Sequence, residues 1–180
     1  MTLLVLGLAL WSGAHLLKRM APDARARLGD PGKGLVALLS VLGIVAMVLG
    51  YRAADSAPLW WPPAFLTHVN NLAMLVAFYL FGVGAAKGTT ARWLRHPQLT
   101  AVKLWAVAHL LVNGDVASVV LFGGLLAWAV AEVVLINRSQ PWDRPADVSV
   151  RGDLKALGIG LVLYAAAAAV HLWLGVNPFG

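Results

Sequence analysis

The chain has 180 residues, of which 60% are hydrophobic and only 12% charged, and its formal net charge is +6. A soluble domain has about 25% charged residues, so this composition excludes a water-soluble globular protein and predicts an integral membrane protein. The absence of cysteine excludes disulfides, thiolate metal sites and cysteine nucleophiles. The excess of Lys and Arg does not indicate nucleic-acid binding, because these residues lie in loops between apolar segments.

Six apolar segments are predicted to cross the membrane as helices. A spanning helix needs roughly 17–25 mostly apolar residues, and these segments are continuously apolar rather than alternating, which argues against strands. The fourth and fifth are separated only by the Asn-Gly-Asp turn at residues 113–115, so we expect a tight helical hairpin there. The first and fourth are short for a full crossing. The predicted segments are residues 3–17, 35–51, 64–84, 98–112, 116–136 and 154–174.

The basic residues predict the orientation of this bundle. All 14 Lys and Arg residues except Arg52 lie in or beside the first, third and fifth loops, and the longest of these is expected at residues 137–153. Because basic loops face the cytoplasm, both chain termini are expected on the outer, periplasmic side. The predicted fold class is therefore an all-α, six-helix transmembrane bundle that forms a single domain over residues 1–180.

Two short motifs in this bundle repeat the pattern Trp-x-x-Ala-His. Trp11 precedes His15 by four positions and Trp105 precedes His109 by four, so each pair shares one helix face. A histidine inside a membrane helix is costly without a partner, and the ordinary partner is a carbonyl or hydroxyl of a neighbouring helix. The functional alternative is haem iron, which takes neutral imidazoles as axial ligands in helix bundles. The motifs therefore indicate either structural histidines or two haem ligands.

The other titratable residues of the spans make a divalent metal site a weaker alternative than haem iron. Such a site would normally add carboxylates or a third histidine. The intramembrane acid Glu132 lies near the cytoplasmic end of the fifth segment and is predicted to snorkel or to pair with Lys. His96 and Arg95 are predicted to stand at an interfacial helix start, and His68 and His171 to be structural groups near the outer face.

Residues 95–128, RHPQLTAVKLWAVAHLLVNGDVASVVLFGGLLAW, resemble the core signature of the NnrU family. The opening WSGAHLL and the WPP before the third segment are similar to the same family, so the resemblance covers nearly the whole chain and implies one NnrU-like transmembrane domain. NnrU-type proteins are multi-span bacterial membrane proteins linked to denitrification through nitrite and nitric oxide reduction. The resemblance implies an inner-membrane location and nitrite or nitric oxide reductase components as partners.

The plant zeta-carotene isomerases, which are relatives of this family, are haem b membrane enzymes with histidine ligands. The resemblance implies haem b as cofactor, His15 and His109 as ligands of its iron, and redox or isomerase-like chemistry on an undefined substrate. His15 lies near the inner face, whereas His109 lies ten residues beyond Leu99, about 15 Å deeper, so a pairing of His15 with His96 also stays open. The predicted cofactor site further includes Trp11, Trp105, Arg95, His96, Asn113 and Asp115.

Two other functions stay open. The Arg95-His96-Pro97 hairpin is distantly similar to membrane methyltransferases of the isoprenylcysteine type, which would use S-adenosylmethionine at the cytoplasmic face. The Tyr and Gly that follow this motif in those enzymes, and the paired Glu after their hairpin, are missing here. Alternatively, glycine-lined helix faces would let the chain act as a non-catalytic assembly partner of a reductase.

Overall fold

The computed structural model describes residues 1–179, and within that range it contains helices, loops and two isolated bridges but no strand. Three short elements, α2, η1 and α6, join or cap the longer helices, and η2 is a π-helical turn that links α6 to α7. The elements are α1 (Thr2–Met20), α2 (Pro22–Arg27), α3 (Pro31–Arg52), α4 (Phe65–Val83), η1 (Thr89–Arg92), α5 (Pro97–Val112), α6 (Val116–Ser118), η2 (Val119–Gly123), α7 (Gly124–Ser139) and α8 (Val150–Trp173).

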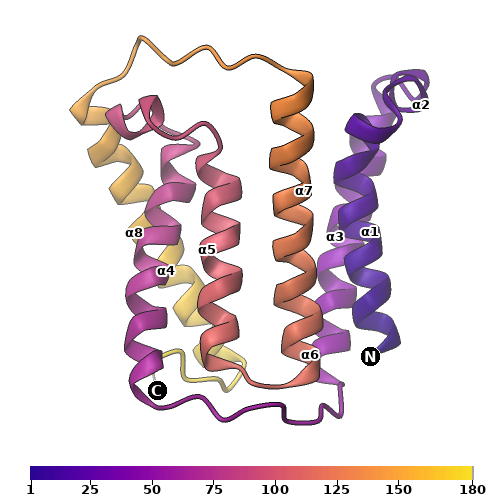
Figure 1. Cartoon of the computed structure of the whole chain (residues 1–180), viewed down its shortest axis with the longest axis vertical. Coiled ribbons are helices and arrows are strands. Elements are labelled where there is room, and N and C mark those ends of the chain that lie inside the picture. The colour runs from indigo at the N-terminus through magenta and orange to yellow at the C-terminus, as the bar shows by residue number, and fades with distance from the viewer. Residues whose placement is uncertain (180) are drawn as a thin grey trace.

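Figure 1 shows the long helices standing side by side, with α7 between the pair α1 and α3 and the group α4, α5 and α8. Five helical segments are long and apolar enough to cross a membrane, namely α1, α3, α4, the continuous α6–η2–α7 segment and α8. These helices fit a multi-pass membrane protein. At 16 residues α5 is apolar but shorter than the others, so the count of six crossings and the hairpin at residues 113–115 stay predictions.

Small residues bring the helices close together. A Cβ built on Gly7 of α1 would lie 2.6 Å from the backbone nitrogen of Met47 in α3, and one built on Gly160 of α8 would lie 2.9 Å from the carbonyl oxygen of Phe78 in α4. Many of the buried hydrophobic side chains are alanines, whereas large apolar side chains such as Leu42 are exposed around the bundle. Close backbone approach inside and large apolar groups outside are what helices packed in lipid require.

Several predicted boundaries need correction. The first segment is longer than the predicted residues 3–17, because α1 continues through Lys18 and Arg19 to Met20, and it is not short for a crossing. The fifth loop is shorter than residues 137–153. The helix α7 continues to Ser139, and α8 begins after Ser149, whose side-chain oxygen accepts a hydrogen bond from the backbone nitrogen of Gly152.

The connections of the bundle divide between its two ends. In Figure 1 α2, the α4–α5 connection and the α7–α8 loop lie at one end, and both marked chain ends lie at the other with the α3–α4 loop. All but one of the Lys and Arg residues belong to, or adjoin, the first set of connections. We therefore refer to the end of the bundle that holds α2, the α4–α5 connection and the α7–α8 loop as the basic end.

Candidate cofactor site

His15 is held on α1 by its own helix. Its Nδ1 donates a hydrogen bond of 2.8 Å to the carbonyl oxygen of Trp11, one turn earlier. The ring lies 4.1 Å from the Trp11 ring and meets the edge of Trp128 of α7 at 5.2 Å, measured between ring centroids. Because a carbonyl can only accept, Nδ1 carries the proton of the neutral ring and Nε2 carries its lone pair.

His109 on α5 repeats this arrangement. Its Nδ1 donates to the carbonyl oxygen of Trp105 at 2.9 Å, and its ring lies 5.2 Å from the Trp105 ring and 4.8 Å from Phe122. The side-chain nitrogen of Asn113 donates to the carbonyl oxygen of His109 at 2.8 Å, so Asn113 closes the end of α5. Both Trp-x-x-Ala-His motifs thus present an imidazole whose Nε2 is the free acceptor.

The π-helical turn η2 places Phe122 against this second motif. Phe122 is buried, and its ring lies 5.0 Å from Trp105 as well as against His109. Single π-turns inside helices are rare and frequently mark functional sites. Hydropathy could not predict this turn, because the apolar pattern is the same in an α-helix and a π-helix. The available signal was the Phe-Gly-Gly run at residues 122–124.

The two histidines lie at different levels of the bundle. His15 contacts Trp128 and His109 contacts Phe122, and these partners are six residues apart, about 9 Å along the helix. The donor chemistry of each imidazole fits an axial iron ligand. Binding of one iron by both would require α1 and α5 to shift along their axes.

A partly buried ion pair lies one helical turn beyond His15 on α1 and Trp128 on α7. Glu132 is 6% exposed, and its carboxylate lies 3.8 Å from Nε of Arg19. It is therefore buried and paired with Arg rather than snorkelling or paired with Lys, because Arg19 extends from α1, which packs beside α7. The indole nitrogens of Trp11 and Trp128 are buried without an acceptor. Since buried donors are normally satisfied, these two indoles fit a site whose ligand supplies acceptor atoms.

Asp115 organises the turn between α5 and α6. Its carboxylate accepts hydrogen bonds from the backbone nitrogen of Ser118 at 3.0 Å, from the Ser118 hydroxyl at 2.6 Å and from the Ser56 hydroxyl at 2.7 Å. Partial burial raises the pKa of Asp115, but the hydrogen bonds from Ser118 and Ser56 outweigh it, and the net pKa lies below its ordinary value. In this structure Asp115 caps α6 and joins it to the α3–α4 loop.

His68 and His171, which were predicted to be structural groups near the outer face, have different surroundings. Asn70 is buried, and its side-chain nitrogen donates to the side-chain oxygen of Asn71 at 3.2 Å. His68 is exposed. His171 donates through Nδ1 to the carbonyl oxygen of Ala167 at 2.8 Å, so the backbone contact of the two motif histidines is not unique to them.

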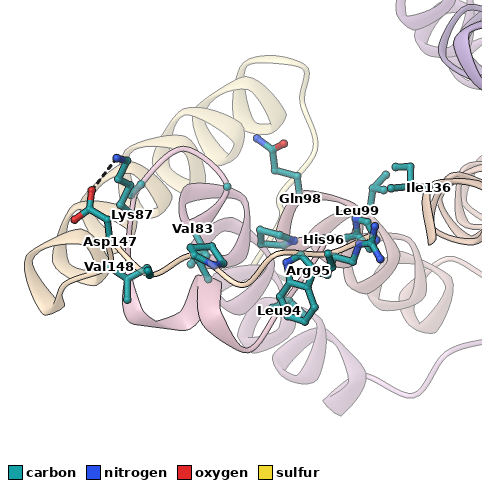
Figure 2. A pocket seen from close by; sticks show the side chains of 17 residues that line it. Val83, Lys87, Leu94, Arg95, His96, Gln98, Leu99, Ile136, Asp147 and Val148 are labelled. Carbon is teal, nitrogen blue, oxygen red and sulfur yellow. Dashed lines mark hydrogen bonds and ion pairs between the residues drawn. The ribbon is translucent and has the colours of Figure 1, made fainter. Parts of the chain in front are cut away.

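Arg95 and His96 meet at the basic end, beside a cavity of about 650 Å³ (Figure 2). As predicted, α5 begins directly after His96, with Pro97 as its first residue. Nε2 of His96 lies 2.8 Å from the side-chain oxygen of Asn137 in α7. Neither His15 nor His109 lines this cavity. The structure therefore divides the predicted cofactor residues among this cavity, the interior of the bundle and the turn at residues 113–115. Among residues 1–179 no group of three or more His, Asp or Glu side chains is arranged to hold a metal ion.

Comparison with known proteins matches nearly the whole chain to one family. No curated protein and no solved structure gives a significant match. The family model described as NnrU protein matches residues 3–178, which include both Trp-x-x-Ala-His motifs, the Arg-His-Pro segment and the π-helical turn. Since this match covers nearly the full length, the chain belongs to the NnrU family.

Proposed function

We propose that this NnrU-family protein binds haem b within the bacterial inner membrane and supports nitrite and nitric oxide reduction. The observation that carries the proposal is that His15 and His109 each combine an Nδ1 hydrogen bond to a backbone carbonyl with a ring packed against two aromatic side chains, which His171 lacks among residues 1–179. Such a bond fixes the tautomer and the ring orientation that a metal-ligating imidazole needs, and it leaves Nε2 free to bind.

Bound haem would supply a redox-active iron, and the surrounding residues supply its environment. Trp11 and Trp128 beside His15, and Trp105 and Phe122 beside His109, are large aromatic groups that exclude water from the ligand nitrogens. The unpaired indole donors are available to acceptor atoms of the ligand. An apolar aromatic surrounding of this kind controls the potential of a haem iron.

The number of membrane crossings and the side of the termini also belong to this proposal. We infer six crossings, in which α5 and the α6–η2–α7 segment form a hairpin and both termini face the periplasm. The short turn at residues 113–115 supports the hairpin, since α5 ends at Val112 and α6 begins at Val116. The three hydrogen bonds that Asp115 accepts hold this turn in place. The basic end then faces the cytoplasm.

Haem content of single variants tests the ligand assignment. His15→Ala and His109→Ala are each expected to lose most of the haem absorbance per protein while the protein still inserts, because the proposal assigns both imidazoles to one iron, with the shift of α1 and α5 that this requires. His68→Ala, which removes an exposed histidine, is the matched control and should retain it. Retention of about half the haem in each single variant would indicate two separate one-histidine sites instead. Full retention in both would contradict the assignment.

Two other activities are separable from this one by direct measurement. The cavity beside Arg95 and His96 would suit the methyltransferase hypothesis, which calorimetric titration with S-adenosylmethionine tests, and absence of binding at millimolar ligand excludes it. The assembly hypothesis predicts that the chain co-purifies with a reductase while carrying no cofactor itself.

A further inference from the structure

The cavity at the basic end plays no part in the proposed haem site. It lies between the α4–α5 connection and the α7–α8 loop, where α4, α5 and α7 have their ends (Figure 2). Figure 2 shows Arg95 and His96 beside one another, and the ion pair of Lys87 with Asp147 at a distance from them across the view. Its position at the ends of apolar helices puts it at the depth of lipid headgroups.

The charge around this cavity is positive and is not balanced within it. Residues 84–98 and 137–148, which bound the cavity, carry five Lys or Arg and two Asp, a net charge of +3. Lys87 is neutralised by Asp147 at 3.0 Å. Arg95 has no acidic partner among residues 1–179. The cavity therefore favours an anion.

Arg95 is held so that part of its guanidinium remains available. Its Nη2 donates to the carbonyl oxygens of Gln140 at 2.6 Å and Pro141 at 3.2 Å. Its Nε and Nη1 bind no described group. A guanidinium fixed at one nitrogen keeps the planar fork that pairs with phosphate oxygens through charge-assisted hydrogen bonds.

Apolar side chains form much of the remaining wall, which favours a ligand that has an apolar part as well as an anionic group. Leu94 comes from the α4–α5 connection and Leu99 from the first turn of α5. Ile136 and Trp142 come from the end of α7 and the loop after it. A ligand complementary to the whole cavity has an anionic group that pairs with Arg95 and an apolar part that packs against these side chains.

We propose that this cavity binds the phosphate group of an anionic phospholipid from the leaflet at the basic end. Arg95 is the principal partner of the phosphate oxygens, and the apolar walls hold the glycerol and the first methylene groups. A free phosphate offers the same anion without the apolar part, so the two sources are separable by experiment.

The test measures lipid retention by the full chain in an uncharged detergent. Native mass spectrometry should show phosphatidylglycerol retained about tenfold better than phosphatidylcholine of the same acyl chains, and Arg95→Gln should reduce this retention about tenfold. Gln98→Glu, at an exposed cavity-lining position in the first turn of α5, should also reduce it. A carboxylate there favours the helix while it repels the phosphate, so this variant keeps the test independent of folding.

Arg27→Gln on α2 is the matched control, because it removes the same charge from the basic end without touching the cavity. It should change retention less than about twofold. Equal retention of the two lipids by the unaltered chain, or unchanged retention in Arg95→Gln and Gln98→Glu, would overturn the proposal. If inorganic phosphate raised the unfolding temperature of the protein as much as phosphatidylglycerol does, the ligand would be free phosphate and not a lipid. If S-adenosylmethionine displaced the bound lipid, the cavity would be assigned to that cofactor.

Discussion

At the residue scale, the same backbone hydrogen bond gives His15 and His109 their chemical character, but the neighbouring residues distinguish them. The ion pair of Arg19 with the buried Glu132 lies one helical turn beyond His15 on α1, whereas His109 lies against Phe122 on the π-helical turn. The repeated motif was visible in the sequence, and so was its spacing. The unpaired indoles and the Arg19–Glu132 pair were not, because they depend on which helices become neighbours.

Breaking the Arg19–Glu132 pair from the arginine side should be costly. Arg19→Gln leaves the buried Glu132 carboxylate without its cation, and we expect a loss of about 3 kcal/mol in the free energy of unfolding. The double variant Arg19→Gln/Glu132→Gln should recover more than half of this loss, since no buried charge remains. Unfolding of the three proteins in detergent measures the difference. A double variant as unstable as the single one would show that the charge is not the cause.

Asp115 should make stability depend on pH in the acidic range. Its pKa is lowered in the folded protein, so its contribution is complete above the ordinary pKa and is lost as the pH falls through the lowered value, below about pH 4. Asp115→Ala should lose about 2 kcal/mol near neutral pH, because the cap of α6 and the Ser56 contact disappear. Thermal unfolding from pH 6 to pH 3 should fall more steeply for the unaltered chain than for Asp115→Ala. Parallel curves would contradict this role.

At the element scale, α8 offers a matched pair of glycines that tests close helix packing. A Cβ on Gly160 would lie 2.9 Å from the carbonyl oxygen of Phe78 in α4, whereas one on Gly158 meets nothing within 4 Å. Gly160→Ala should therefore lower the free energy of unfolding by about 1–3 kcal/mol, while Gly158→Ala should leave it unchanged or raise it by up to about 1 kcal/mol. Thermal unfolding in detergent compares the two. Equal effects would show that α8 does not pack on α4 as described.

The elements themselves were largely predictable. Each of the six apolar segments coincides with a helix, because continuous apolarity is a strong signal in a chain of this composition. Their ends were less predictable, since α1 continues through two basic residues and α7 passes the predicted boundary. The helices α2 and η1 escaped prediction because they are short, and η1 also depends on contacts with a distant part of the chain. One such contact joins η1 to α8, where Asp153 accepts hydrogen bonds from Thr89 and Thr90.

At the scale of the whole molecule, the number of crossings decides where the termini lie. Six crossings put both termini on one side of the membrane, and five put them on opposite sides. We expect a periplasm-dependent reporter such as alkaline phosphatase to be active at either terminus, and green fluorescent protein to be dark there and fluorescent in the loop at residues 140–149. Opposite reporter patterns at the two termini would show that α5 does not cross, and inverted patterns at both would show that the bundle has the opposite orientation.

The cavity at the basic end could not be predicted from the sequence. The cavity at the basic end forms where two loops meet, through contacts such as that of Ser149 with the backbone of Lys87. No local pattern encodes a meeting of loops about 50 residues apart, so Arg95 and His96 were predicted only as an interfacial helix start and from their resemblance to known motifs.

The central claim is that this membrane protein holds haem b, and a visible absorption spectrum of the detergent-purified protein tests it most directly. Grown with a haem precursor and measured oxidised and then dithionite-reduced, the protein should show a sharp Soret band and resolved bands on reduction, with haem b recovered by pyridine extraction. A featureless visible spectrum from folded, haem-supplemented protein would contradict the claim and leave the two Trp-x-x-Ala-His motifs as packing elements of the bundle.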